Sequence, residues 1–358
     1  MTENLVITGA GGFLGWHVRV LAQALDLPAP TLVDRELLAS PARLAPVLSS
    51  ADRVIHIAGV NRGDDVSKGN VALAQHLADG LRACGTPPKA VVFANSIQAG
   101  NGTAYGDGKA AAADLLAEIT RWSGSDFADV RLPNLFGEHG RPNYNSVIAT
   151  FCRLLADGGD PQVTGDRELE LMHATDAAAL LLGTTRQRAT VRRSVSELAD
   201  QLRSFATLYG RAEFPDLTTR FDVRLFNTYR SHLAPEPVAL TRHQDPRGSL
   251  VETVKVHGGA GQSYCSTTVP GVTRGQHFHL SKVERFVVIG GEAEICLRRL
   301  FHDEVLRFRV SGSEPAVIDM PAMWVHNITN IGPSDLTTIF WSNNLFDPAN
   351  PDTYPEAV

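Results

Sequence analysis

The chain has 358 residues, of which 43% are hydrophobic and 20% are charged, and its formal net charge at pH 7 is -6. A chain of this length is expected to form two domains, because single hydrophobic cores rarely grow beyond about 250–300 residues. The acidic balance and the lack of a basic stripe argue against a nucleic-acid partner. With neither a charged-then-apolar leader nor an apolar run of roughly 18 residues, we expect a cytoplasmic protein without a membrane partner.

Glycines follow the first apolar run of the chain. Residues 4–8 are typical of a buried parallel strand, and a helical apolar pattern continues to about Leu25. A strand, a G-x-x-G-x-x-G turn and a helix in this order indicate a dinucleotide site, since the helix N-terminus attracts a pyrophosphate. A plain glycine-rich turn is the alternative. The residues expected to bind the cofactor are Gly9, Gly12, Phe13, Leu14 and Gly15.

The next expected strand, over residues 31–35, ends where the adenosine ribose is normally bound. An acid at this place favours the free 2′-hydroxyl of NAD, whereas a neighbouring arginine can hold the 2′-phosphate of NADP. Asp34 and Arg35 stand side by side. These two residues by themselves therefore leave both cofactors open.

Two further apolar runs, over residues 53–59 and 89–95, alternate with helical stretches. Strands that alternate with helices predict an α/β doubly wound sheet of the Rossmann type. Ala58 and Gly59, at the end of the first of these runs, are expected to contact the cofactor.

Ser96 ends the fourth expected strand, and Tyr105 and Lys109 follow it. Residues four apart share one face of a helix, and an ammonium beside a phenol favours the phenolate form of tyrosine. The phenol could then act as an acid or base near neutral pH, with Ser96 holding a substrate carbonyl. A surface pair is the alternative. Gly106 and Gly108 are expected to loosen this helix by about 1 kcal/mol each.

These motifs resemble the extended short-chain dehydrogenase/reductase family over roughly residues 1–235. The resemblance implies a catalytic trio of Ser96, Tyr105 and Lys109, with Lys109 also at the cofactor, and leaves reductase, epimerase and dehydratase open. Polar residues further along suit a sugar or a diphosphate, and equally suit turns. These candidate substrate-binding residues are Asn134, Asn143, Tyr144 and Asn145.

Beyond a Pro-Glu-Pro stretch the pattern changes, so we expect a reductase domain over residues 1–237 and a second domain over 238–358. Short runs that alternate polar and apolar residues, broken by Gly and Pro, predict an all-β barrel or jelly roll.

Potential metal ligands gather in this second domain. His277 and His279 form an H-x-H, whose side chains share one face of a strand, and Glu284 can return to that face across a bend. His326 could come from a later strand. Three neutral imidazoles and a carboxylate suit Zn²⁺, Fe²⁺, Mn²⁺ or Ni²⁺. A histidine-rich strand face without a metal is the alternative.

With this spacing the second domain resembles the cupin family. The residues that match the two cupin motifs are Gly271, His277, His279, Glu284 and Gly291, then Pro321, His326 and Asn330. Pro315 and Met323 stand where the second motif has glycines. Because methionine does not relax into positive φ as glycine does, we expect a different turn before His326 and an altered ligand geometry there.

Taken together, the chain resembles the bifunctional capsular-polysaccharide synthesis enzymes of the UDP-N-acetyl-L-fucosamine pathway. The segments that carry this resemblance are 56–62, 133–137, 142–152, 245–248, 271–291, 326–330 and 346–354. It implies a zinc cupin domain that epimerises C3 of a UDP-4-keto-6-deoxy-N-acetylhexosamine, and a reductase domain that reduces its C4 ketone with NADPH. A UDP-N-acetyl-6-deoxy-L-talosamine product and homodimers are implied as well. Arg35 matches the family's cofactor-binding arginine and favours NADPH, whereas Asp34 keeps NADH open.

The expected chemistry explains why one chain would carry both sites. The C3 proton lies next to the C4 ketone, so a cation near the ketone oxygen favours its removal, and reduction must come second because it destroys the ketone. Lys282 is the expected base, since a buried lysine loses its charge readily, and Tyr264 is a weaker candidate for the opposing acid. A solvent-facing Lys282 is the alternative.

Two other functions stay open. The reductase could act on another nucleotide-linked 4-keto-deoxysugar. Alternatively, the cupin domain could bind a ligand or stabilise a dimer without catalysis, which the departures at Pro315 and Met323 would favour.

Overall fold

The computed structural model describes residues 3–63 and 65–358. It divides into two compact units, Met1–Thr150 with Arg167–Ser194, and Phe151–Asp166 with Val195–Val358. The second unit therefore contains the barrel together with a helical segment that precedes it in sequence. Within the described residues, no helix is both long and apolar enough to cross a membrane.

A parallel five-stranded sheet, in the order β2-β1-β3-β4-β5, forms the centre of the first unit. Its strands are β1 (Leu5–Thr8), β2 (Thr31–Val33), β3 (Arg53–His56), β4 (Ala90–Ser96) and β5 (Asp126–Leu132). The chain leaves β1 in one direction for β2 and returns past it to β3. Ligands of such sheets bind at this reversal, beyond the carboxyl ends of the strands. The doubly wound prediction is confirmed.

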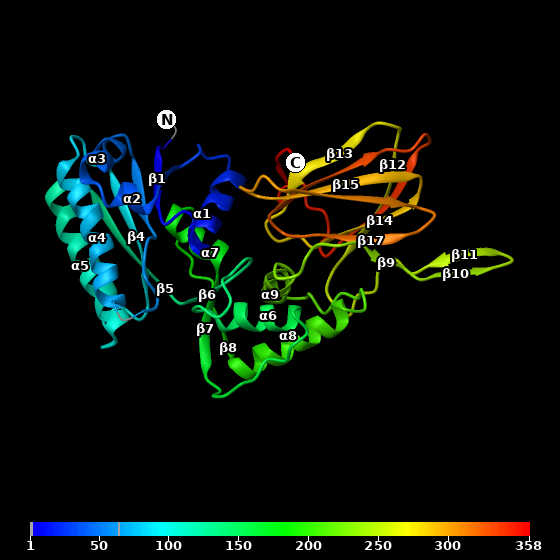
Figure 1. Ribbon diagram of the computed structural model, residues 1–358, viewed down its shortest axis with the longest axis horizontal. Helices are drawn as coiled ribbons and strands as arrows, with labels where there is room; N and C mark the ends of the chain where they lie inside the picture. The colour runs from blue at the N-terminus through cyan, green and yellow to red at the C-terminus, as the bar shows by residue number, and fades with distance from the viewer. Residues whose placement is uncertain (1–2, 64) are drawn as a thin grey trace. The chain divides into compact units, whose positions relative to one another are not determined.

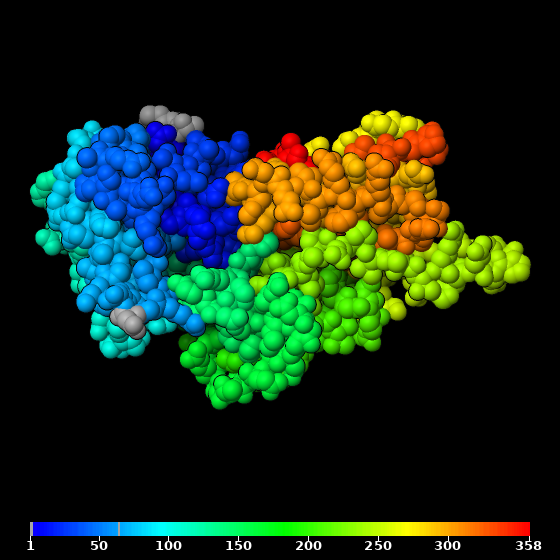
Figure 2. Space-filling model, viewed as in Figure 1, coloured from blue at the N-terminus to red at the C-terminus, as the bar shows by residue number. Residues whose placement is uncertain are grey.

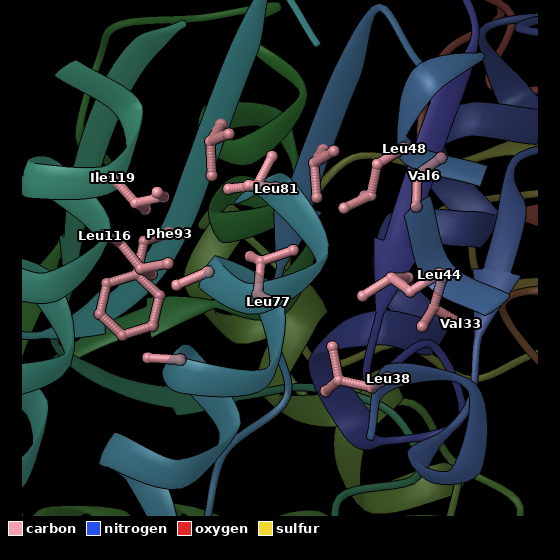
Figure 3. Packing of buried hydrophobic residues seen from close by; sticks show 14 of the residues in the cluster. Val6, Val33, Leu38, Leu44, Leu48, Leu77, Leu81, Phe93, Leu116 and Ile119 are labelled. Carbon is pink, nitrogen blue, oxygen red and sulfur yellow. The ribbon is translucent and has the colours of Figure 1, made fainter. Parts of the chain in front are cut away.

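Helices cover both faces of this sheet (Figure 1). Leucines of α3 (Pro41–Ser49) and α4 (Val66–Ala83) pack on the strands with α5 (Ala104–Ser123), and Figure 3 shows the interlocked side chains of this layer. The short α2 (Arg35–Leu38) adds Leu38 to it. On the other face, α1 (Phe13–Ala24) packs against α7 (Ala174–Leu182).

A small sheet and three helices complete the α/β part of the chain. The small sheet consists of β6 (Asn134–Phe136), β7 (Glu168–His173) and β8 (Val191–Ser194), all of which belong to the first unit. Of the helices, α6 (Val147–Ala156) runs from the first unit into the second, whereas α8 (Val195–Tyr209) and α9 (Arg220–Arg230) belong to the second.

Two antiparallel five-stranded sheets form the barrel, in the orders β12-β19-β14-β17-β9 and β16-β15-β18-β13-β20. Their strands are β9 (Val238–Ala239), β12 (Gln262–Thr268), β13 (Thr273–Phe278), β14 (Glu284–Gly290), β15 (Glu292–Arg299), β16 (Val305–Ser311), β17 (Ala316–Met320), β18 (Trp324–Asn330), β19 (Leu336–Ser342) and β20 (Tyr354–Pro355). Both sheets contribute side chains to one core, for example Phe286, Ile295 and Ile328. The predicted all-β second domain of jelly-roll type is confirmed.

A two-stranded hairpin, β10 (Arg242–Asp245) with β11 (Gly248–Val251), is exposed along most of its length. Figure 2 shows it, in yellow-green, extending beyond the barrel.

Helix α9 is joined to the barrel by buried polar contacts. Arg230 donates to the carbonyl of Met320 at 2.9 Å, and Asn227 donates to the carbonyl of Ser281 at 2.7 Å. On β14, the buried Arg285 pairs with Asp319 through two bonds of 2.7 and 2.8 Å. Burying these groups is tolerated because they are paired, so α9 is held in one position on the barrel.

Candidate cofactor site and metal centre

Two glycines of the fingerprint are required by close backbone contacts. Gly9 has φ +73, and a Cβ there would lie 2.6 Å from the amide nitrogen of Ala58. A Cβ on Gly15 would lie 2.3 Å from the carbonyl oxygen of Gly9. Gly12 is the N-cap of α1, and the first turn of that helix holds no acidic residue. This turn therefore fits a dinucleotide pyrophosphate, which needs close backbone approach and a helix N-terminus free of negative charge.

The second strand ends at Val33, two residues earlier than expected, and Asp34 and Arg35 begin the next helix, where their roles differ. The Asp34 carboxylate caps α2 by accepting a 2.7 Å hydrogen bond from the amide of Leu37. Arg35 is the first residue of that helix and is exposed. One of the two candidate ribose-binding side chains is thus already engaged within the protein.

The loop after β3 is held by β1 and α4, and it lies beside Lys109 of α5. Thr8 and His56 are joined by a 2.7 Å hydrogen bond across β1 and β3, and the buried Asn70 amide bonds to both the N–H and the carbonyl of Val60. A Cβ on Gly59 would lie 3.9 Å from Nζ of Lys109. The expected cofactor residue Gly59 and the expected catalytic residue Lys109 therefore lie side by side.

Ser96, Tyr105 and Lys109 come from the end of β4 and the start of α5. Burial raises the pKa of Tyr105, the nearby Tyr144 adds to this, and a hydrogen bond with Ser96 opposes it. Lys109 is 5% exposed and donates to the carbonyl of Ala94 at 2.8 Å, and burial lowers its pKa to about 8. Our expectation that Lys109 lowers the pKa of Tyr105 is therefore wrong for the chain alone, because the ammonium is directed at the strand.

Gly106 and Gly108 were expected only to weaken α5, and the structure gives each a reason. A Cβ on Gly106 would lie 2.2 Å from the amide oxygen of Asn101, and one on Gly108 would lie 2.7 Å from Cα of Ser67. The helix can approach its neighbours at this end only with glycine at both positions. These close contacts lie between Tyr105 and Lys109 in the sequence of α5.

The loop between β6 and α6 contains the other candidate substrate residues. Asn143 has φ +56, and its carbonyl accepts a 3.1 Å hydrogen bond from Arg62. The guanidinium carbons of Arg62 and Arg141 lie 6.0 and 4.9 Å from the ring centroid of Tyr144. Two exposed cations thus meet at a ring that is close enough to Tyr105 to affect its pKa.

The positions of the other two candidate substrate-binding residues, Asn134 and Asn145, give less support for that role. Asn134 begins β6, and its amide donates to the carbonyl of Glu170 at 3.1 Å, which joins β6 to β7. Asn145 is exposed in the same loop as Tyr144.

In the barrel, His277, His279, Glu284 and His326 lie together, and their ligand atoms are all within 4.8 Å of one another. The register pairs His277 with His326 across β13 and β18, while Glu284 begins β14 in the other sheet. Oε2 of Glu284 lies 3.1 Å from Nε2 of His279 and 3.4 Å from Nε2 of His326. The structure thus brings the four predicted ligands to one point.

Backbone carbonyls orient two of the rings. Nδ1 of His279 bonds to the carbonyl of Asp352, and Nδ1 of His326 bonds to the carbonyl of Trp324 at 3.3 Å. A carbonyl carries no proton, so each Nδ1 must donate, and in the neutral ring each Nε2 keeps its lone pair. Both lone pairs then face the Glu284 carboxylate.

The charges of the cluster suit a divalent cation. Burial, followed by the neighbouring imidazoles His326 and His279, lowers the pKa of His277 to about 3. Burial would raise the pKa of Glu284, but protonation of the facing rings of His279 and His326 would hold it well below its usual range. Nε2 of His326 is fully buried without a well-directed hydrogen bond among the described residues. Neutral imidazoles, an ionised carboxylate and an unsatisfied buried nitrogen fit a metal such as Zn²⁺.

The turn before His326 corrects one expectation. Met323 adopts φ +63, the conformation that we expected it to avoid. Its side chain is completely buried, and its amide donates to the carbonyl of His279 at 2.7 Å. Packing and this hydrogen bond outweigh the steric cost of a left-handed methionine, which is about 1–3 kcal/mol. His326 therefore joins the cluster despite the lost glycine.

Lys282 and Tyr264 lie in different surroundings. Nζ of Lys282 donates to the carbonyl of Pro351 at 2.9 Å and lies 3.3 Å from Oγ1 of Thr353. Its charge also contributes to the low pKa of His277, so it lies near the cluster. The register places Tyr264 opposite Phe340, which lies opposite Phe286, and that ring meets His326 edge to face at 5.8 Å.

Sequence reasoning missed Arg62, Arg141 and Asp352. Arg62 and Asp352 stand in segments that carry the family resemblance, which was their only signal. Arg141 carries no motif, and only the fold brings it to the site.

Known proteins match both units. The NAD dependent epimerase/dehydratase family matches residues 5–193, and the polysaccharide biosynthesis C-terminal domain matches residues 243–354. The UDP-2-acetamido-2,6-beta-L-arabino-hexul-4-ose reductase of Pseudomonas aeruginosa is 31% identical over 99% of this chain and 99% of its own length. The spore coat polysaccharide biosynthesis protein SpsL of Bacillus subtilis is 25% identical over 32% of this chain and 81% of its own.

A solved structure gives the same result along the whole chain. The capsular polysaccharide assembling protein CapF from Staphylococcus aureus is 34% identical, covers 99% of this chain and 100% of its own, and has a TM-score of 0.62. The chain therefore belongs to the NAD dependent epimerase/dehydratase family and, over its full length, to the two-domain capsular-polysaccharide enzymes that its sequence resembles.

Proposed function

We propose that this chain is a bifunctional nucleotide-sugar enzyme. Its metal centre would epimerise C3 of a UDP-4-keto-6-deoxy-N-acetylhexosamine, and its first unit would reduce the C4 ketone to a UDP-N-acetyl-6-deoxy-L-talosamine-type product. One observation carries this proposal: a reductase trio and a four-ligand metal cluster occur in one chain, which matches the Pseudomonas aeruginosa hexul-4-ose reductase along its length.

The cofactor proposed is NADPH, which supplies the hydride when bound. The cap formed by Asp34 supports this choice, because a carboxylate that accepts the Leu37 amide is less available to a ribose hydroxyl. Arg35 is exposed beside it and would hold the 2′-phosphate. An Arg35→Ala variant should raise KM for NADPH and leave KM for NADH nearly unchanged.

At the ketone, Tyr105 would donate the proton to the C4 oxygen while Ser96 orients that oxygen. The raised pKa of Tyr105 supports a phenol that is protonated before reaction, as a proton donor must be. Lys109 would stabilise the phenolate that forms by turning its ammonium away from the carbonyl of Ala94.

Arg62 and Arg141 would bind the diphosphate of the nucleotide sugar. Two guanidiniums at one aromatic ring, close to Tyr105, suit an extended dianion whose sugar must reach that phenol. Asn143, Tyr144 and Asn145 would line the same site. Replacing either arginine by alanine should raise KM for the sugar roughly tenfold, which corresponds to about 1.4 kcal/mol, and should leave NADPH binding unchanged.

In the barrel, His277, His279, Glu284 and His326 would hold Zn²⁺ or another divalent cation. The cation would supply Lewis-acid stabilisation of the ketone oxygen as the C3 proton leaves. Lys282 is proposed to take that proton, with Tyr264 as the acid on the opposite ring face. The proximity of Lys282 to His277 supports its role.

The two activities can be separated in one experiment with UDP- and dTDP-linked 4-keto sugars. A Tyr105→Phe variant should oxidise NADPH about 10²–10⁴-fold more slowly and still exchange the C3 proton with deuterated solvent. A Glu284→Gln variant should lose the exchange and still bind NADPH.

Loss of exchange in Tyr105→Phe would contradict this division of labour. A wild-type protein that is folded, oxidises NADPH and shows no exchange would favour a cupin domain without catalysis. Faster turnover of the dTDP-linked sugar would mean that the substrate carries dTDP rather than UDP.

A further inference from the structure

The segment over residues 351–356 lies against the loop that joins two of the proposed ligands, His279 and Glu284, beside β13 (Figure 1). The Asp352 carboxylate accepts hydrogen bonds from the amides of Leu280, Ser281 and Lys282, at 2.8, 3.0 and 2.8 Å. It also accepts one from the Ser281 hydroxyl at 3.1 Å. These are three of the four residues that connect His279 to Glu284, and the amide of the fourth, Val283, bonds to Asn343. One carboxylate therefore holds most of the connection between two proposed ligands.

The backbone of the same residue orients a ligand directly. The carbonyl of Asp352 accepts the Nδ1 proton of His279, which leaves Nε2 of that ring facing Glu284 at 3.1 Å. Side chain and main chain of Asp352 therefore act together: one sets the position of the loop and the other sets the tautomer and direction of His279.

Asp352 is held in an unfavourable conformation to do this. It has φ +43, in the left-handed region. The pairing of Phe278 with Tyr354 in β13 and β20 holds the segment in place, and so does a 3.0 Å bond from the amide of Glu356 to the carbonyl of Gln276. A non-glycine residue in this region is maintained only where the surroundings determine it, and such positions gather at functional sites.

We propose that Asp352 is the positioning residue of the metal centre, an inference that rests on the function proposed above. It holds the loop after His279 so that His279 and Glu284 meet the metal at a fixed separation. The metal bound at this centre would be a divalent transition-metal cation such as Zn²⁺ or Co²⁺.

The test measures metal binding by the full chain, with Zn²⁺ in competition with a chromophoric chelator. An Asp352→Asn variant keeps the carbonyl that orients His279 but replaces the carboxylate that holds the loop, so it should bind Zn²⁺ roughly 10–100-fold more weakly, the usual effect of losing a group outside the ligand set. Asp347→Asn is the matched control, since that carboxylate lies in the same stretch and bonds only locally, to Ala349 and Asn350. It should bind Zn²⁺ as the wild type does.

The second readout is the visible ligand-field spectrum of the Co²⁺-loaded protein, which reports ligand geometry rather than fold. It should change in Asp352→Asn at saturating Co²⁺, while thermal unfolding of the metal-free protein stays near that of the wild type. Unchanged affinity and spectrum in a folded Asp352→Asn would overturn the positioning role, and so would equal losses in Asp347→Asn.

If Asp352→Asn does not fold, Ser281→Ala decides, because it removes one of the four bonds. A several-fold loss of Zn²⁺ affinity supports the proposal, and wild-type affinity overturns it. If the wild-type chain binds neither Zn²⁺ nor Co²⁺, the metal centre itself is refuted. If the wild type binds and the variant binds equally well, only the positioning role of Asp352 is refuted.

Discussion

The two candidate sites differ in whether their side chains have the required charges and directions before a metal or cofactor binds. The metal site has them and is called the prepared site below; the reductase site does not and is called the unprepared site. In the barrel, burial lowers the pKa of His277 to about 3, and the carbonyls at Nδ1 of His279 and His326 leave Nε2 of each neutral ring with the lone pair that a cation requires. In the first unit, burial lowers the pKa of Lys109 to about 8 and raises that of Tyr105. These shifts weaken the ammonium–phenolate pair expected of a reductase.

The difference follows from where each site lies. The candidate metal ligands come from both sheets and from the loop after β13, and backbone carbonyls orient two of them inside the barrel. The candidate reductase residues lie at the end of β4 and in the first two turns of α5, where a dinucleotide would supply the missing polar surface. A site that encloses its ligand can be fixed in advance, whereas a site completed by a cofactor takes its final electrostatics from that cofactor.

The largest expected effect is the loss of Zn²⁺ affinity when one ligand of the prepared site is removed. His326→Ala should weaken Zn²⁺ binding by more than about 100-fold, because partners outside the ligand set alone are worth about 10–100-fold. Its ring is 0% exposed, so water cannot readily replace it. Chelator competition measures the affinity, and His243→Ala in the exposed hairpin is the control. An unaffected affinity would remove His326 from the ligand set.

The next effect concerns the unprepared site and its pH dependence. The pKa of Lys109 is lowered to about 8, so the ammonium is present below that pH and is lost above it. We therefore expect kcat/KM for NADPH oxidation to fall up to about tenfold per pH unit above pH 8, since this ratio reports groups of the free enzyme. A profile that stays flat to pH 9.5 would contradict the role of Lys109. A Lys109→Met variant should be slow and should lack this fall.

Local motifs made much of both sites predictable. The glycine turn, the Tyr105–Lys109 pair and the H-x-H each lie within a few residues, so strand and helix periodicity place them without tertiary knowledge. The direction of Lys109 was not predictable in this way. A nearby charge and burial shift a pKa in opposite senses, and only the fold shows that Lys109 bonds to Ala94.

Contacts between segments that are distant in the chain could not be predicted from sequence patterns. Arg62 and Arg141 meet at Tyr144 from two loops, and Asp352 reaches a loop about 70 positions earlier. Met323 shows a related limit: its φ preference is local, but burial and one hydrogen bond decide its conformation. The expected boundary near residue 237 rests on composition, whereas α9 is joined to the barrel through Arg230 and Asn227.

Gly108→Ala tests whether close contact between α4 and α5 holds the candidate reductase residues in place. Helix propensity alone predicts stabilisation by about 1 kcal/mol. The added Cβ would lie 2.7 Å from Cα of Ser67, so we expect destabilisation by about 1–3 kcal/mol instead. Denaturant unfolding measures it, with Ala111→Gly on the exposed face as the control that should follow propensity. A stabilised Gly108→Ala would mean that α4 and α5 are not in close contact at this end.

The smallest effect compares two variants at the turn before His326. Met323→Ala and Met323→Gly both remove the buried side chain, but only alanine keeps a Cβ at φ +63. At ordinary helix or strand positions glycine is less stable than alanine by about 0.5–1 kcal/mol, and at a left-handed position the order should reverse by a similar amount. We therefore expect Met323→Gly to unfold at higher denaturant concentration than Met323→Ala. It should also retain more Zn²⁺ affinity, since the glycine that the cupin motif carries there keeps the turn without strain. The opposite order would show that the turn relaxes once the methionine side chain is removed, and that packing of Met323 rather than backbone geometry holds His326 in place.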